Sequence, residues 1–169
     1  AKKMAKTGAE LPFDFDGGMA LRFFLGNMNG CIGEVSAAAL LLGAVYMLHR
    51  RCITWHVPAA YLGTVVVIAT ATWAVNPDTF MPPHFHLVTG GLMLGALYMA
   101  TDMVTTPVTR RGLLIFGVGC GILTMCIRLV PAGAYPEGVS FAILLMNALT
   151  PLINRATRPR IFGQKRTTQ

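Results

Sequence analysis

The chain has 169 residues, of which 54% are hydrophobic and only 12% are charged. Soluble domains carry about a quarter charged residues, so this composition excludes an ordinary soluble domain and favours a membrane protein. The net charge of +7 would suit a nucleic-acid-binding protein, but the basic residues lie in short loops and at the two ends, and only Arg128 falls within an apolar segment. Because this distribution is typical of a multi-pass membrane protein, we expect the lipid bilayer, and no nucleic acid, as a partner.

Residues 1–31 form a polar, glycine-rich segment that precedes the first apolar run. The segment includes Lys2, Lys3 and Lys6 but lacks the apolar core of a signal peptide. Because the chain begins at Ala1 with such a segment, we expect it to be part of a longer polypeptide. We therefore expect residues 1–31 to form a separate N-terminal unit.

Five apolar segments follow this unit. Each has about 17–20 residues, the length that a helix needs to cross about 30 Å of hydrocarbon. The sequence thus predicts an all-α multi-pass membrane protein, with a five-helix transmembrane domain over residues 32–155 and a basic tail over residues 156–169. The predicted spans are residues 32–49, 57–75, 85–101, 112–130 and 138–154.

The basic residues predict the orientation of these spans. An odd number of spans places the two termini on opposite sides of the membrane. Positive charges gather at 50–51, at 110–111 and from residue 155 to the C-terminus, while the opposing loops 76–84 and 131–137 contain no Lys or Arg. The positive-inside rule predicts that the arginine-bearing turns and the C-terminus are cytoplasmic. The N-terminal unit is then extracytoplasmic, although it also carries basic residues.

Glycines and one proline refine the predicted helices. Gly91-x-x-x-Gly95 and the run Gly117-x-Gly119-x-Gly121 lie within predicted spans, where small residues let helices approach closely. No strand precedes the second run, so close packing explains it better than a dinucleotide-binding loop does. Pro151 is predicted to break the last helix near its exit.

Two acidic residues stand out as candidate functional groups. Glu34 opens the first predicted span among glycines, where the helix dipole stabilises a carboxylate; it is equally compatible with an ordinary first-turn acid. Asp102 lies in a threonine-rich run at the end of the third span. Its carboxylate suits a flavin ring or a cation, and the alternative is a helix cap paired with Arg110 or Arg111.

Other polar residues within or beside the spans have simpler interpretations. Arg128 lies near the outer end of the fourth span, where it is predicted to extend to the membrane surface or to bond Glu137. Asn147 is predicted to form a hydrogen bond across helices. His84 and His86 are two possible metal ligands without a third, so no metal site is predicted.

Several strings, in order along nearly the whole chain, resemble the RnfD/NqrB family, which comprises a membrane protein of the Rnf complex and its relative in the sodium-translocating NADH:quinone reductase. They are Phe24-Leu-Gly-Asn-Met-Asn-Gly-Cys-Ile-Gly-Glu-Val-Ser36, Gly90-Gly-Leu-Met-Leu-Gly-Ala-Leu-Tyr-Met-Ala-Thr-Asp102, Pro107-Val-Thr109 and Tyr135-Pro-Glu-Gly-Val-Ser-Phe-Ala-Ile-Leu-Leu-Met-Asn-Ala-Leu-Thr-Pro151. The resemblance implies the C-terminal half of a ten-helix subunit built from two five-helix repeats, with a urea-channel-like architecture.

The resemblance also implies an activity and its partners. The expected role is a membrane flavoprotein subunit of an ion-translocating electron-transport complex in the cell inner membrane. Such a complex couples electron transfer between ferredoxin and NAD(H) to the movement of Na⁺ or H⁺, together with the other Rnf/Nqr-type subunits. The chain is not expected to be active alone. The alternative is half of a non-redox channel or solute transporter with the same fold.

The expected cofactor is an FMN attached through its phosphate to a threonine. The family's attachment sequence ends Gly-Ala-Thr, whereas here Gly8-Ala9 is followed by Glu10, so the attachment threonine is expected upstream of Ala1. Residues 1–31 would then lie close to the flavin. The expected cofactor-binding residues are Asn27, Gly30 and Glu34 near the FMN, and Thr101, Asp102 and Thr105 at a second site for riboflavin, another flavin or the ion.

Overall fold

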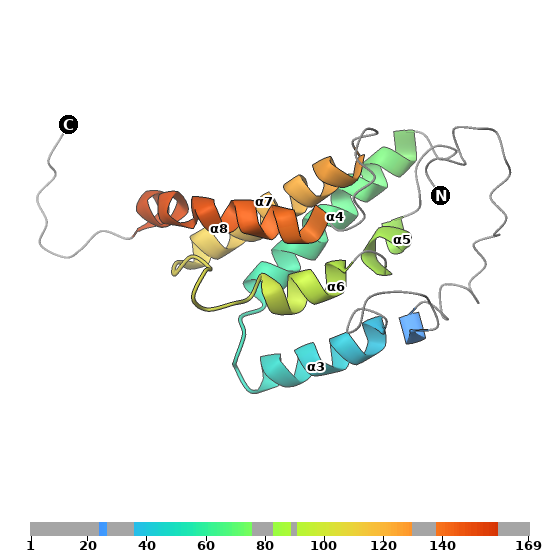
Figure 1. The fold of residues 1–169 in the computed structure, drawn as a ribbon, viewed down its shortest axis with the longest axis horizontal. Helices are drawn as coiled ribbons and strands as arrows, with labels where there is room; N and C mark the ends of the chain where they lie inside the picture. Colours follow the sequence, from blue (N-terminus) through green and yellow to red (C-terminus); the bar gives the residue numbers. More distant parts are fainter. Residues whose placement is uncertain (1–23, 27–35, 76–82, 89–90, 130–137, 159–169) are drawn as a thin grey trace, which may run out of the picture.

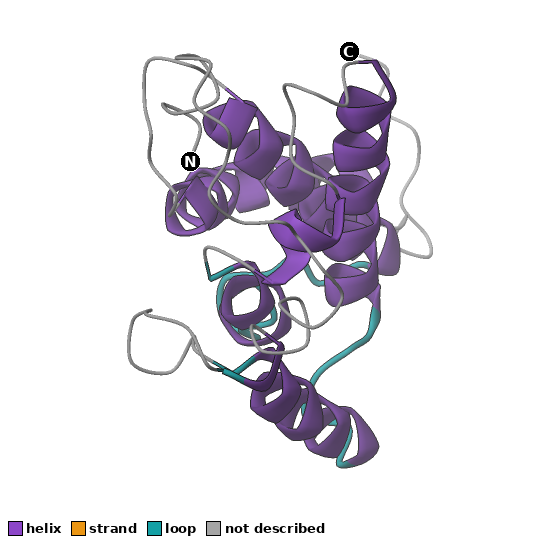
Figure 2. Cartoon of the chain, turned by 90° about the vertical axis from the view of Figure 1, so that its right-hand side faces the viewer, coloured by secondary structure: helices purple, strands orange, loops and turns teal. Residues whose placement is uncertain are grey.

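The computed structural model describes residues 24–26, 36–75, 83–88, 91–129 and 138–158. All regular secondary structure in this part of the chain is helical (Figures 1 and 2). The elements are α3 (Ala37–His49), α4 (His56–Val75), α5 (Pro83–Val88), α6 (Leu92–Leu94), the π-helix η1 (Gly95–Met99), α7 (Arg110–Leu129) and α8 (Gly138–Thr157). The predicted all-α class is confirmed, and each predicted span coincides with a helix or with a group of helices.

Three of these helices, α4, α7 and α8, are long and apolar enough to cross a membrane. Each has 20 residues, or about 30 Å of helix at the usual rise. Helix α3 is apolar but has only 13 residues, because Ser36 caps its first turn by accepting a hydrogen bond from the N–H of Ala39 at 3.3 Å. Helix α3 thus begins later than the predicted start at residue 32. With three helices long enough to span a bilayer, the protein is a multi-pass membrane protein.

Helix α7 lies between α4 and α8 and makes most of its contacts with these two helices. An added Cβ at Gly117 would lie 2.8 Å from the Cβ of Ala60, and one at Gly121 would lie 2.7 Å from the Cβ of Thr64. Gly119 instead faces α8, where an added Cβ would lie 2.7 Å from the Sδ of Met146. The prediction that this glycine run serves close packing is therefore confirmed.

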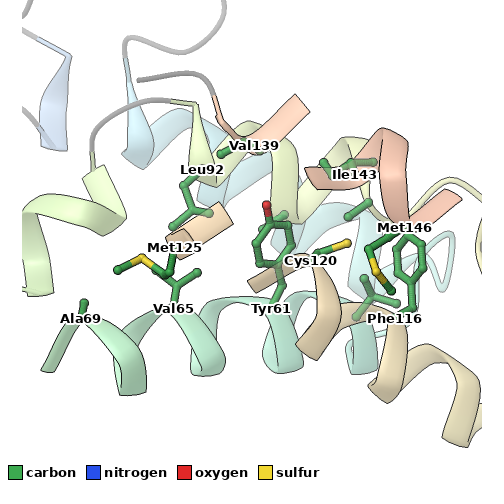
Figure 3. Close-up of a cluster of buried hydrophobic side chains, with 13 residues drawn as sticks. Tyr61, Val65, Ala69, Leu92, Phe116, Cys120, Met125, Val139, Ile143 and Met146 are labelled. Carbon is green, nitrogen blue, oxygen red and sulfur yellow. The ribbon is translucent and has the colours of Figure 1, made fainter. Parts of the chain in front are cut away.

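The core of the bundle lies between α4, α7, α8 and the segment formed by α6 and η1. In Figure 3, Tyr61, Val65 and Ala69 extend from α4 on one side of this cluster, with Val139 and Ile143 on the other. The hydroxyl of Tyr61 lies 2.6 Å from that of Thr124, which in turn donates to the carbonyl of Cys120 at 2.8 Å. The hydroxyls of Tyr61 and Thr124 thus find hydrogen-bond partners within this apolar core.

The third predicted span is not one helix, which corrects the expectation for residues 85–101. Helix α5 ends at Val88, and Gly91 has a left-handed backbone with φ 65° before α6 begins. Glycine adopts this conformation without a steric penalty, and a residue in it cannot continue a right-handed helix. The chain then forms the π-helix η1, in which the N–H of Ala100 donates to the carbonyl of Gly95 at 2.7 Å.

The predicted break at Pro151 is also wrong, because α8 continues to Thr157. Proline removes the N–H that would bond the carbonyl of Asn147. The last turn is nevertheless held by contacts with the start of α7: Asn154 Oδ1 accepts from the N–H of Val108 at 3.1 Å, and the Thr109 hydroxyl donates to that of Thr157 at 2.6 Å. Tertiary hydrogen bonds therefore outweigh the local cost of the proline.

Among the described elements, α3 packs mainly against α6 and η1. The hydroxyl of Tyr98 in η1 donates to the carbonyl of Leu40 at 2.9 Å. The same hydroxyl occupies the space beside Gly43, so a side chain at this position would have to displace it. A single aromatic residue thus fixes α3 to the interrupted third segment.

Helices α4 and α7 begin, and helices α3 and α8 end, on the same side of the bundle, so the arginine-bearing turns lie at one end of it. In Figure 1 the end of α3, the start of α7 and the end of α8 all lie toward the left. These places carry the Arg50–Arg51 and Arg110–Arg111 pairs and Arg155. The arrangement matches the predicted gathering of these arginines on one face of the membrane.

Candidate functional site

The predicted site at Asp102 is a compact turn between η1 and α7. The N–H of Val104 donates to one carboxylate oxygen at 3.3 Å, and the Thr105 hydroxyl donates to the other at 3.4 Å. The Thr106 hydroxyl donates to the backbone carbonyl of Asp102 at 2.8 Å. This pattern follows from the tendency of aspartate to bond the backbone two residues further on. The predicted alternative, an ion pair with Arg110 or Arg111, is not among these contacts.

The structure brings Asp102 and Thr105 together but leaves Thr101 facing its own helix. The Thr101 hydroxyl bonds the carbonyls of Leu97 at 2.8 Å and Tyr98 at 3.1 Å. Thr101 thus caps the end of η1, because the last carbonyl groups of a helix have no intrahelical partners. Asp102 itself is exposed, whereas Thr105 is partly buried.

The chemistry of this turn sets what it can bind. Its threonine hydroxyls already donate within the chain, while each Asp102 oxygen accepts one bond and keeps a further lone pair. An exposed carboxylate of this kind fits a cation or the ring N–H of a flavin. The turn has no uncommitted hydroxyl for the carbonyl oxygens of a flavin, so other residues would have to supply those donors.

The predicted residues Asn27, Gly30 and Glu34 lie outside the described residues. Their placement near an FMN therefore stays a prediction.

Arg128 has a role that the sequence did not predict. Its guanidinium donates to the carbonyl of His86 in α5 at 2.9 Å, close to the interruption of the third segment. Carbonyl groups at the end of a helix lack intrahelical partners, and in a membrane they need another donor. Arg128 thus caps α5 rather than extending to the membrane surface. The other predicted interaction, a bond to Glu137, stays a prediction because Glu137 lies outside the described residues. The paired Gly90–Gly91 was the sequence signal for this break.

Asn147 does not form the predicted bond across helices through its carbonyl oxygen. Its Oδ1 is buried and has no hydrogen-bond partner among the described residues. The residue lies on the face of α8 that also carries Val139 and Ile143, whose side chains contact Gly95 of η1. Asn147, whose buried oxygen lies on this face of α8, was not predicted as a site residue.

The chain is similar to a known family of proteins. Residues 2–163 match the model of the NQR2, RnfD, RnfE family. The chain is 46% identical over 157 residues to the D subunit of the proton-translocating ferredoxin:NAD(+) oxidoreductase complex of Clostridium ljungdahlii, covering 91% of this chain and 46% of that protein. It is 49% identical over 139 residues to the D subunit of the Na(+)-translocating ferredoxin:NAD(+) oxidoreductase complex of Acetobacterium woodii, covering 82% of this chain and 41% of that protein.

A third relative is the D subunit of the ion-translocating oxidoreductase complex of Stutzerimonas stutzeri, which is 48% identical over 141 residues, covering 83% of this chain and 39% of that protein. The chain thus spans less than half the length of each of these relatives. Because the family model covers residues 2–163 of the 169, the chain belongs to the NQR2, RnfD, RnfE family.

Proposed function

We propose that this chain is the C-terminal half of a membrane flavoprotein subunit in an ion-translocating electron-transport complex. The complex couples electron transfer between ferredoxin and NAD(H) to the movement of Na⁺ or H⁺, and this chain acts only together with the other subunits. The observation that carries the proposal is the family match over residues 2–163, joined to a bundle of apolar helices with an exposed acidic turn at its arginine-bearing end. The relative from Clostridium ljungdahlii is named as proton-translocating, whereas the relative from Acetobacterium woodii is named as Na⁺-translocating.

The proposal includes an architecture and an orientation. The other half would supply a second five-helix repeat, giving ten helices with a urea-channel-like arrangement in the cell inner membrane. The end that carries Arg50, Arg111 and Arg155 would face the cytoplasm, as the positive-inside rule expects, and so would the C-terminus. The interrupted third segment supports a transporter-like fold, because discontinuous helices are typical of such proteins.

The proposed cofactor is a covalent FMN on a threonine upstream of Ala1, close to Asn27, Gly30 and Glu34. A flavin supplies the redox chemistry, and the protein positions it. The full-length complex should therefore be yellow, with a fluorescent flavin that stays on this subunit in a denaturing gel. A colourless complex that moves a neutral solute would instead establish the channel or transporter alternative.

The Asp102 turn is proposed to serve the translocated ion or a second, non-covalent flavin. Replacing Asp102 with alanine in the intact complex should lower ion-coupled electron transfer about tenfold to a hundredfold, the effect of losing one interaction with a charged group. The amount of protein in the membrane should not change, since the side chain is exposed and bonds only its own turn.

A second variant separates charge from turn geometry. Asp102→Asn keeps an oxygen that can accept from the N–H of Val104 but removes the negative charge. If Asp102 meets a cation, Asp102→Asn should be as impaired as Asp102→Ala. Full coupled activity in both variants would remove Asp102 from the site, and full activity in Asp102→Asn alone would reduce its role to turn formation.

A further inference from the structure

The geometry points to the arginine-bearing end of the bundle as a binding surface for the headgroups of anionic phospholipids. Six exposed arginines gather there from three separate stretches of chain: Arg50, Arg51, Arg110, Arg111, Arg155 and Arg158. The Thr109–Thr157 and Val108–Asn154 hydrogen bonds fix the start of α7 against the end of α8. This inference does not depend on any flavin or on the direction in which the protein faces.

Within the part of the chain that the structure describes, the charges at this end are not balanced by acidic residues. Asp102 is the only acidic residue in the part of the chain that the structure describes. Its carboxylate accepts hydrogen bonds from Val104 and Thr105 of its own turn. The compensating negative charge for the arginines must therefore come from outside these residues, and guanidinium groups bind phosphate as well as carboxylate through two parallel hydrogen bonds.

The surface below the arginines is apolar, which favours a lipid over a soluble anion or an acidic protein. On α7, Arg111 begins an exposed face that continues through Leu114, Ile115, Val118 and Ile122 at helical spacing. On α8, Arg155 lies one turn beyond Leu152, which is 63% exposed. A phospholipid matches both parts, because its phosphate meets the arginine while its acyl chains cover the leucine and isoleucine side chains.

The test uses the full-length subunit within its purified complex, after removal of native lipid with detergent. Dioleoylphosphatidylglycerol is titrated against it, and bound lipid is counted by native mass spectrometry. Each arginine near an anionic headgroup contributes roughly fivefold in affinity. The Arg111→Gln/Arg155→Gln double variant should therefore bind this lipid roughly twenty-five-fold more weakly. The Arg111→Lys/Arg155→Lys variant, which keeps both charges, should lose much less affinity. Dioleoylphosphatidylcholine should not compete in either protein.

Lys2→Gln/Lys3→Gln is the matched control, because it removes the same charge from the N-terminal unit, and it should bind phosphatidylglycerol like the unaltered protein. Equal phosphatidylglycerol binding by the Arg→Gln variant and the control would overturn the proposal. So would inorganic phosphate that displaces the lipid at equal concentration, since the apolar faces would then contribute nothing. Loss of a partner subunit from the Arg→Gln variant, with lipid affinity unchanged, would assign this surface to a protein interface instead.

Discussion

Replacing Gly117 with valine is expected to destabilise the subunit by about 1–3 kcal/mol, the usual effect of forcing extra atoms into a packed core. The Cβ of any residue at this position would lie 2.8 Å from the Cβ of Ala60 and 2.9 Å from the carbonyl oxygen of Val57. The second of these atoms belongs to the backbone of α4, so it cannot move aside without shifting the helix. The variant must therefore push α4 and α7 apart.

Cys120 provides a direct measure of this change. It is fully buried in the α4–α7 core, so a thiol-reactive fluorophore should reach it only when the bundle opens. In a full-length subunit whose other cysteines are serine, Gly117→Val should lower the temperature at which Cys120 reacts.

Gly63→Ala is the matched control for this prediction, because an added Cβ at Gly63 meets nothing within 4 Å. Its unfolding temperature should stay the same or rise slightly, since alanine favours a helix over glycine by about 1 kcal/mol. Equal unfolding temperatures for Gly117→Val and Gly63→Ala would show that α4 and α7 do not pack through Gly117.

Replacing Arg128 with methionine should remove the hydrogen bond that its guanidinium donates to the carbonyl of His86. A buried group deprived of its partner costs about 1–3 kcal/mol, and water is scarce within a membrane to replace the lost bond. Methionine keeps the length and apolar stem of arginine, so loss of packing contributes little. The reaction of Cys120 on heating should again begin at a lower temperature, and a protease site introduced between α5 and α6 should become easier to cut.

Arg111→Met supplies the comparison, because Arg111 lies on the same helix but is exposed at its other end. This variant removes the same guanidinium without uncovering a carbonyl of α5. If Arg128→Met is no less stable than Arg111→Met, then Arg128 does not hold the interrupted segment in place.

The sequence predicted the long helices well because their apolar runs match the thickness of a bilayer. Residues 112–130 and 138–154 correspond closely to α7 and α8, and the glycine run of α7 packs as expected. The prediction that the third span is a single helix was wrong for a physical reason. Hydropathy reports whether a residue tolerates lipid, whereas the break at Gly91 depends on backbone conformation, which an apolar run does not reveal.

The same limit explains what was missed at the candidate site. The sequence placed Asp102 and Thr105 in one polar run, and the structure joins them in a turn whose bonds link residues two and three positions apart. The partner of Arg128 is a backbone carbonyl that becomes available only because the third span is interrupted. Likewise, the continuation of α8 beyond Pro151 depends on hydrogen bonds to residues 108 and 109, which no local pattern in α8 contains.

The arginine-bearing turns must lie at one surface of the membrane if the topology and the proposed function are correct. Single cysteines at positions 51, 111 and 158, in a full-length protein otherwise free of cysteine, can be tested with a membrane-impermeant thiol reagent in intact cells and in inverted vesicles. We expect all three to react only in inverted vesicles, while a cysteine at position 79 reacts in intact cells. Reaction of positions 51 and 111 from opposite sides would contradict the topology.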